Sequence, residues 1–292
     1  MKKAVFLAAA ILFPGMASAA DMAVKARPLP PAPTMTWTGF YAGLNAGYGW
    51  GDASNSNSPV DPASQALFGV FGPADFNTSF RKRGAIAGGQ VGYNWQFTAR
   101  GVLGLEADLQ WSDINGSGFR SAPLLIAPTI LYETSTEQRL RWFGTVRGRL
   151  GFLVTPSLLL YGTGGLAYGE TESRGNIRIN NLGGGAVIVI AIAPPFSAVC
   201  TFPGPPCYAG SSSETHVGWT AGAGGEWKIA PNWSVKAEYL RVALQGSSAT
   251  LVSPAPPSTP GVSTIFRFNT QNYDIVRVGV NYQFSGPVVA KY

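Results

Sequence analysis

The single histidine of the chain, His216, is the residue type on which hydrolytic catalysis usually depends, because it can act as a base beside a nucleophile. Ser211, Ser212, Ser213 and Glu214 precede it and offer a nucleophile and an orienting carboxylate by type. Neighbours in sequence need not converge in space, however, and the segment contains no nucleophile-elbow motif. We therefore predict that the protein is not an enzyme.

The same histidine has the chemistry of an axial haem ligand. Apolar loop residues could surround the macrocycle while the imidazole of His216 binds the iron. No supporting motif accompanies this histidine, and a solvated or loop-packed histidine has the same signature. We predict no cofactor, and the binding of haem or another ligand at the protein surface stays open as an alternative function.

Cys200 and Cys207 are the two cysteines of the chain. The segment between them, with the sequence Pro-Gly-Pro-Pro, can reverse the chain direction, and no cluster of histidine and cysteine offers a metal site. In an oxidising compartment this pattern predicts a disulfide that shapes one loop.

Charged residues alternate with apolar residues in several segments, so that each set would share one face of a β-strand. If such strands close into a narrow barrel, the charges face an interior that side chains fill, where buried charges must be paired. A plug of salt bridges is the interpretation that we carry forward, and a gated, narrow porin-like pore stays open as its rival. The charges assigned to this lumen network are Glu106, Asp108, Arg139, Arg141, Arg147, Arg149, Glu226, Lys236, Glu238 and Arg277.

The N-terminal region has the features of an export signal. Lys2 and Lys3 precede an apolar run and a stretch of small residues, which predicts a secretory signal peptide over residues 1–20. Residues 21–36 are rich in proline and predict a periplasmic linker. The barrel is then assigned to residues 37–284 and a C-terminal extension to residues 285–292.

The composition favours a membrane protein without helical spans. Charged residues make up 12% of the chain, and 37 glycines stand beside 8 tryptophans, 11 tyrosines and 16 phenylalanines. Beyond the signal peptide there is no clean run of apolar residues long enough for a spanning helix. The formal net charge of +6 is small and dispersed, so we expect no nucleic-acid partner. An exported chain of this kind fits the closed barrel, which is the other structure that can cross a membrane.

Eight segments have the alternation of strands that face lipid on one side. In the fifth segment it is ambiguous which residues face outward, because Leu158, Leu159 and Leu160 are all apolar. We take Leu160, Leu166 and Tyr168 to point outward. Connections of three to five residues alternate with long ones, which predicts an all-β, eight-stranded antiparallel up-and-down transmembrane β-barrel with four long extracellular loops and short periplasmic turns. The eight predicted segments are residues 37–50, 84–97, 102–112, 139–152, 158–171, 217–229, 233–242 and 272–284.

Several motifs resemble those of the alphaproteobacterial outer-membrane immunogenic protein family. They are WTGFYAGLNAGYGWG from Trp37, YGTGGLAYG from Tyr161, GWTAGAGGEW from Gly218, KAEYL from Lys236 and VRVGVNYQF from Val276. The resemblance implies a small surface-antigen barrel in the cell outer membrane that contributes to envelope integrity and antigenicity.

The chain also ends its last predicted strand in a pattern typical of barrel assembly. Tyr282 and Phe284 form this predicted assembly signal, although eight residues follow it. The partners that we expect are outer-membrane lipid and lipopolysaccharide and the barrel-assembly machinery. The apolar loops predict either a mutual cap over the barrel mouth or contact with an unknown partner.

Overall fold

The computed structural model describes residues 36–71, 76–124, 127–254 and 258–284, all of which belong to the unit Met35–Tyr292. The predicted signal peptide, the linker up to residue 35 and the C-terminal extension lie outside the described residues. No helix in the described ranges is both long and apolar enough to cross a membrane.

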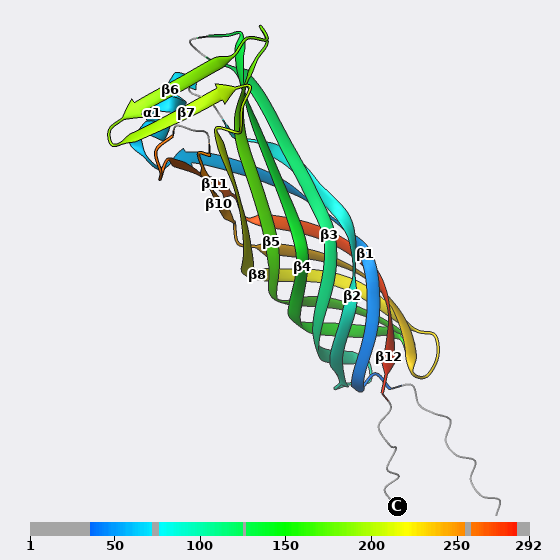
Figure 1. The fold of residues 1–292 in the computed structure, drawn as a ribbon. Coiled ribbons are helices and arrows are strands. Elements are labelled where there is room, and N and C mark those ends of the chain that lie inside the picture. The colour runs from blue at the N-terminus through cyan, green and yellow to red at the C-terminus, as the bar shows by residue number, and fades with distance from the viewer. Residues whose placement is uncertain (1–35, 72–75, 125–126, 255–257, 285–292) are drawn as a thin grey trace, which may run out of the picture. The chain divides into compact units, whose positions relative to one another are not determined.

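Eight antiparallel strands form a closed ring, because the first strand pairs with both the second and the last (Figure 1). This confirms the predicted fold class. Three short connections join the strands at one end of the ring, the turn end, and longer segments join them at the other, the loop end. The ring strands are β1 (Gly39–Pro59), β2 (Ser79–Gln96), β3 (Gly101–Pro123), β4 (Ile130–Thr155), β5 (Leu158–Asn181), β8 (Tyr208–Lys228), β9 (Trp233–Leu244) and β12 (Gln271–Gln283).

Three of the long connections carry elements of their own at the loop end. Strands β10 (Ser248–Val252) and β11 (Ser263–Phe268) pair with each other between β8 and β1, and so extend the wall above the ends of β9 and β12. Helix α1 (Pro62–Phe71) follows β1, and the hairpin of β6 (Val187–Ala193) and β7 (Phe196–Phe202) forms a separate two-stranded sheet. Figure 1 shows this hairpin lying across the loop end beside α1.

The ring strands run further toward the loop end than the sequence predicts. Predicted strand 102–112 extends to Pro123, and predicted strand 139–152 begins at Ile130. Between these two strands the connection therefore shortens to a few residues. The added segments keep the alternation of a strand but reverse its sense, with polar side chains outside and buried ones such as Thr134 and Ile177 inside. The predicted strands therefore end where the wall leaves the lipid, because the alternation with apolar residues outside ends there.

Apolar side chains cover the outer surface of the lower wall and end in aromatic rows. Phe40 and Trp50, both exposed on β1, are separated by about ten residues, which is the span of a transmembrane strand. Leu160 and Leu166 on β5 point outward as predicted, whereas the neighbouring Leu159 is buried. The exposed aromatic residues of the wall include Phe40, Tyr48, Trp50, Tyr93, Trp95, Phe97, Trp111, Phe152, Trp219, Trp227, Trp233, Tyr239, Tyr282 and Phe284.

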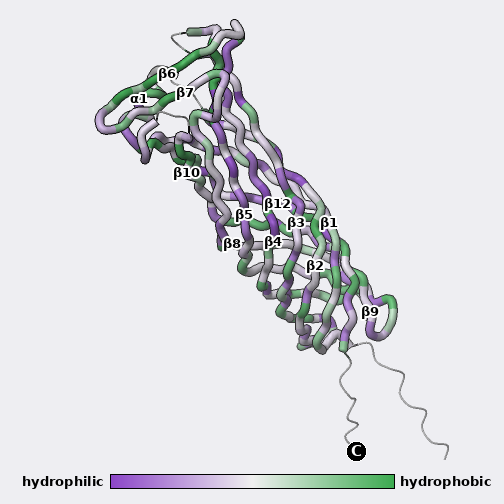
Figure 2. Tube along the Cα trace, in the orientation of Figure 1, coloured by the Kyte–Doolittle hydropathy of each residue, from purple (hydrophilic) through white to green (hydrophobic). Residues whose placement is uncertain are grey.

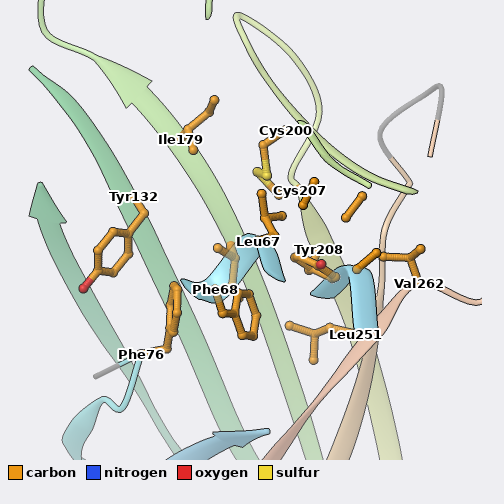
Figure 3. Close-up of a cluster of buried hydrophobic side chains, with 14 of the residues drawn as sticks. Leu67, Phe68, Phe76, Tyr132, Ile179, Cys200, Cys207, Tyr208, Leu251 and Val262 are labelled. Carbon is orange, nitrogen blue, oxygen red and sulfur yellow. A yellow bond between two sulfur atoms is a disulfide. The ribbon is translucent and has the colours of Figure 1, made fainter. Parts of the chain in front are cut away.

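An apolar cluster, here called the cap, fills the loop end of the barrel (Figure 3). Helix α1 begins after Asp61, whose side chain accepts a hydrogen bond from the Ser64 backbone at 2.8 Å, and contributes Leu67 and Phe68 to this cluster. Cys200 and Cys207 form a disulfide within it, with their Cα atoms 4.8 Å apart. The apolar connections thus pack against one another. Figure 2 also shows the hydrophobic character of α1 and β6.

Candidate functional site

Eight charged side chains meet inside the lower half of the barrel, and we call this group the charged cluster. Four are carboxylates and four are cations, so their formal charges cancel. Each has at most 3% of its side chain exposed. The strands β3, β4, β8, β9 and β12 supply Glu106, Asp108, Arg147, Arg149, Glu226, Lys236, Glu238 and Arg277, all of which were predicted from the alternation.

Arg147 lies at the centre of the charged cluster and bridges opposite walls of the barrel. Its guanidinium donates to Asp108 at 2.8 Å and to Glu238 at 2.9 Å, and it also pairs with Glu106. Arg277 contacts the same carboxylates, with Nη2 at 3.1 Å from Asp108 and 2.7 Å from Glu238. Two planar guanidinium groups therefore share a set of carboxylates in a geometry that gives several charge-assisted hydrogen bonds.

The remaining ion pairs extend the charged cluster toward the turn end. Lys236 Nζ lies 2.9 Å from Glu106 Oε2, and Arg149 Nη2 lies 2.7 Å from Glu226 Oε2. The guanidinium of Arg149 also stacks 3.8 Å from the centre of the Tyr161 ring. Every carboxylate of the cluster thus has a cation in direct contact, which is the condition for burying such charges.

Neutral polar side chains add hydrogen bonds to these charges, and the sequence analysis did not assign them to the lumen network. The Tyr41 hydroxyl donates to Glu106 at 2.7 Å and accepts from Arg149 at 3.1 Å. Gln90 donates to Asn281 at 2.7 Å, and Asn281 donates to Glu226 at 2.8 Å. Gln90 and Asn281 occupy inward positions of predicted strands. Their place in the alternation of inward and outward residues could therefore have identified them as lumen residues.

Arg139 and Arg141 do not belong to the charged cluster, and their assignment to it was wrong. The register of β4 against β5 shifts between Leu140 and Trp142, which inserts Arg141 as an extra residue. A one-residue bulge reverses the side-chain phase of everything beyond it. Arg139 therefore points outward and pairs with Asp113 at 2.9 Å, and Arg141 pairs with Glu172 at 3.1 Å.

A second group of buried side chains, here called the apolar layer, lies above the charged cluster toward the loop end. On β4 the inward residues pass from Arg147 through Thr145 to Phe143 and Leu140, and Phe143 has no exposed surface. The layer consists of Ile86, Ile114, Leu140, Phe143, Ala167, Leu240, Val242, Leu244, Tyr273 and Ile275.

The turn end of the lumen is covered by a smaller apolar group around Trp37. This tryptophan is 1% exposed, and its indole Nε1 donates to the Pro156 carbonyl at 3.1 Å. Lys228 Nζ lies 4.9 Å from the centre of its ring. Trp37 therefore belongs to the interior, although its place at a strand end suggests an interfacial residue.

His216 points into the barrel from β8 and is 8% exposed. Its Nε2 atom is buried and lies 3.8 Å from the Glu214 carboxylate. An axial ligand must present this nitrogen to an approaching iron, so the position does not favour the haem interpretation. Within the described ranges, no group of histidine, cysteine or acidic side chains is arranged to hold a metal ion.

Tyr282 and Phe284, the predicted assembly signal, lie on the outer surface at the turn end. Their rings pack edge to face with centres 5.3 Å apart, and the Phe284 backbone donates to the Phe40 carbonyl at 2.8 Å. Recognition by the assembly machinery remains a prediction, because contacts within the folded chain do not test it.

Lys82 is buried between the apolar layer and the cap. Its Nζ donates to Gln138 and to the Tyr273 hydroxyl, both at 3.1 Å, and no carboxylate of the described residues forms an ion pair with it. The flanking Arg81 and Arg83 are exposed on the outer face, which places this part of β2 beyond the acyl chains of the lipid. Burial lowers the pKa of Lys82 to about 7, whereas the charge of Asp52 acts in the opposite direction.

This pKa predicts a pH-dependent stability. The unfolded chain binds more protons than the folded protein from about pH 7 up to the ordinary lysine pKa of 10.5. The free energy of unfolding should therefore rise with pH in this window, by on the order of 1 kcal/mol per pH unit. Urea unfolding in detergent across the window should show a smaller rise in Lys82→Met than in the wild type. Burial also lowers the pKa of Lys228, to about 8, and this adds a rise of the same sign in both proteins. Equal slopes in both proteins would contradict the prediction.

The comparisons with known proteins agree with this architecture. Residues 6–284 match the family described as outer membrane protein beta-barrel domain. A 31 kDa outer-membrane immunogenic protein of Brucella melitensis biotype 1 is 37% identical over 287 residues, which cover 97% of this chain and 100% of that protein. The chain belongs to this family of outer-membrane immunogenic barrels.

Two further relatives by sequence are also outer-membrane proteins. A 25 kDa outer-membrane immunogenic protein of Brucella canis is 27% identical, with 97% of this chain and 99% of that protein covered. A 22 kDa outer membrane protein of Rhizobium leguminosarum bv. viciae is 27% identical, with coverages of 78% and 74%. The crystal structure of the outer membrane protein OprG from Pseudomonas aeruginosa matches 86% of this chain and 99% of that chain, with 11% identity and a TM-score of 0.42.

Membership of the family locates this barrel in the outer membrane, as the sequence predicted. In such barrels the short turns lie in the periplasm and the long connections outside the cell. The turn end, with Trp37 and Phe284, is therefore periplasmic, and the cap with its disulfide is extracellular.

Proposed function

We propose that this protein is a structural, non-catalytic surface barrel that does not conduct, and that it contributes to envelope integrity and antigenicity. The observation that carries the proposal is the complete neutralisation and burial of the charged cluster. A conducting pore keeps a water-filled path through its interior, whereas an eight-stranded barrel has room only for its side chains.

The energetic cost of opening supports the same conclusion. An ion that crosses the lumen must separate contacts such as that between Arg147 and Asp108, and leave their charges buried without partners. Such a loss costs on the order of 3 to 5 kcal/mol. The apolar layer then offers the ion no polar group in exchange for its hydration. The two barriers lie in series along the same path.

Antigenicity rests on the family and on the position of the cap. The Brucella relatives are named as immunogenic outer-membrane proteins. In this chain the β6–β7 hairpin is apolar and accessible, with Ile188 at 65% and Ile192 at 71% exposure. A packed surface element of this kind presents a defined shape to an antibody.

Planar-bilayer recording tests the proposal. The purified, folded barrel should insert without a steady, porin-like conductance. Gel mobility with and without boiling verifies that the inserted protein is folded, because a closed barrel has no free edge from which to unravel. Large, stable channels in the wild type would overturn the proposal and favour the pore. A deletion strain should also become more sensitive to detergent, and complementation with the wild type should reverse this.

A further inference from the structure

The bulge in β4 creates a basic position on the outer surface. Arg139 and Arg141 would lie in the lumen if the alternation of β4 continued unbroken, but the inserted residue turns both outward. Their side chains are 43% and 53% exposed. Each has a carboxylate partner, and such exposed pairs contribute little to stability, which leaves the guanidinium groups available to another anion.

Two further arginines continue this position along β2. Arg83 faces Asn115 of β3, which in turn faces Arg139 of β4, so the two arginines occupy one row about 10 Å apart, or two strand spacings. Within the described ranges the Arg83 side chain forms no hydrogen bond or ion pair. Arg81, the next outward residue, lies 3.9 Å from Asp52, with both side chains at least 90% exposed. We call Arg81, Arg83, Arg139 and Arg141 the arginine row.

The arginine row has few carboxylates within its own strands. Asp113 on β3 accepts from Arg139 at 2.9 Å. Toward β5 the row borders a small pocket, in which Glu137, Glu172 and Arg174 join Arg139 and Arg141. The four arginines thus outnumber Asp113, the carboxylate between them on β3. The neighbouring carboxylates lie at the two borders of the row, with Asp52 on β1 and with Glu137 of β4 and Glu172 of β5.

The position of the arginine row along the barrel axis is given by the tryptophans beside it. Trp50 pairs with Arg83 in the register of β1 and β2, and Trp111 pairs with Trp142 just below the bulge. Tryptophans concentrate where acyl chains meet the headgroups. The arginines directly beyond them therefore lie at the level of the headgroups of the outer leaflet.

We infer that the arginine row binds the phosphate groups of the phosphorylated glycolipid, lipopolysaccharide, in the surrounding outer leaflet. Guanidinium groups bind phosphate through two parallel hydrogen bonds, a geometry that lysine cannot provide. The distribution of lysine and arginine in the chain agrees with this difference. In the described ranges all three lysines, Lys82, Lys228 and Lys236, are buried, and the exposed cations of the wall are arginines.

The test compares lipopolysaccharide binding by the purified, folded barrel and by Arg83→Gln/Arg139→Gln. Lipid-free protein in detergent is titrated with purified lipopolysaccharide and followed by tryptophan fluorescence, to which Trp111 and Trp142 beside the row contribute. Loss of two charge-assisted contacts should weaken binding about tenfold or more. The single variant Arg83→Gln breaks no contact within the described part of the fold, and should weaken binding by a smaller factor.

The matched control is Arg241→Gln/Arg267→Gln, which removes two exposed arginines outside the row and should bind like the wild type. Lipopolysaccharide stripped of its lipid phosphates should bind weakly to every variant. Equal affinity of the wild type and Arg83→Gln/Arg139→Gln would overturn the inference. So would unchanged affinity for the dephosphorylated glycolipid, or stronger arginine-dependent binding to a soluble sulfated polysaccharide, which would assign the row to a different partner.

Discussion

Arg147→Ala is expected to lower the free energy of unfolding of the barrel by about 3 to 5 kcal/mol, because it removes one partner from a buried ion cluster. Glu106, Asp108 and Glu238 all contact this guanidinium. After its removal four carboxylates face three cations in a space closed to water. The cost comes mainly from the charges left behind rather than from the attraction lost.

Urea unfolding in detergent, followed by gel mobility and tryptophan fluorescence, measures this effect. The control is Arg178→Ala, which removes an exposed arginine from β5 and should change stability by less than about 0.5 kcal/mol. The double variant Arg147→Ala/Asp108→Asn restores the charge balance and should lose less than the sum of the single variants. If Arg147→Ala proved as harmless as Arg178→Ala, the charged cluster would not hold the walls together.

Phe143→Ala should destabilise the barrel by a similar amount, about 3 to 5 kcal/mol, for a different reason. Phe143 has no exposed surface and packs in the apolar layer, so its truncation leaves a cavity between the strands. The same unfolding measurement applies. The control is Phe119→Ala, because Phe119 points outward from β3 with 67% exposure and should contribute little.

Conductance measurements on Phe143→Ala and on Arg147→Ala/Phe143→Ala test which group of side chains closes the lumen. Phe143→Ala alone should remain non-conducting in a planar bilayer, because the charged cluster below it is intact. Arg147→Ala/Phe143→Ala weakens both barriers and should show leak where it still folds. Steady conductance in Phe143→Ala alone would mean that the charged cluster does not block ions.

The sequence predicted the lipid-facing part of the barrel well, because the same environment surrounds every strand there. Lipid outside and a narrow interior force strict alternation, and that alternation identified inward residues on five strands, including Glu106 and Arg277. The assignment of Arg139 and Arg141 to the lumen was wrong because a bulge depends on pairing between strands, and the sequence of a single strand does not reveal that pairing. The neutral residue Gln90 occupies an inward position of predicted strand 84–97, but its hydrogen-bonding role becomes visible only beside Asn281.

Above the lipid the sequence was a poorer guide. The wall there continues with polar residues outside, so the expected apolar-outside pattern ends while the strand does not. The hairpin of β6 and β7 was assigned only to an apolar loop, since helix α1, which it contacts, belongs to a different connection. Lys82 gave no signal at all, because a lysine between two arginines usually indicates a solvated segment.

The separation of the cap from the apolar layer has an evolutionary consequence. Gln138 donates to Ser173 and Ser247 at 3.2 and 3.1 Å, and this polar level divides the two hydrophobic clusters. Packing changes at the tip therefore need not be transmitted to the part of the wall that must insert into lipid. Under immune selection the chain can exchange residues of the β6–β7 hairpin while it retains the sequence constraints of membrane assembly.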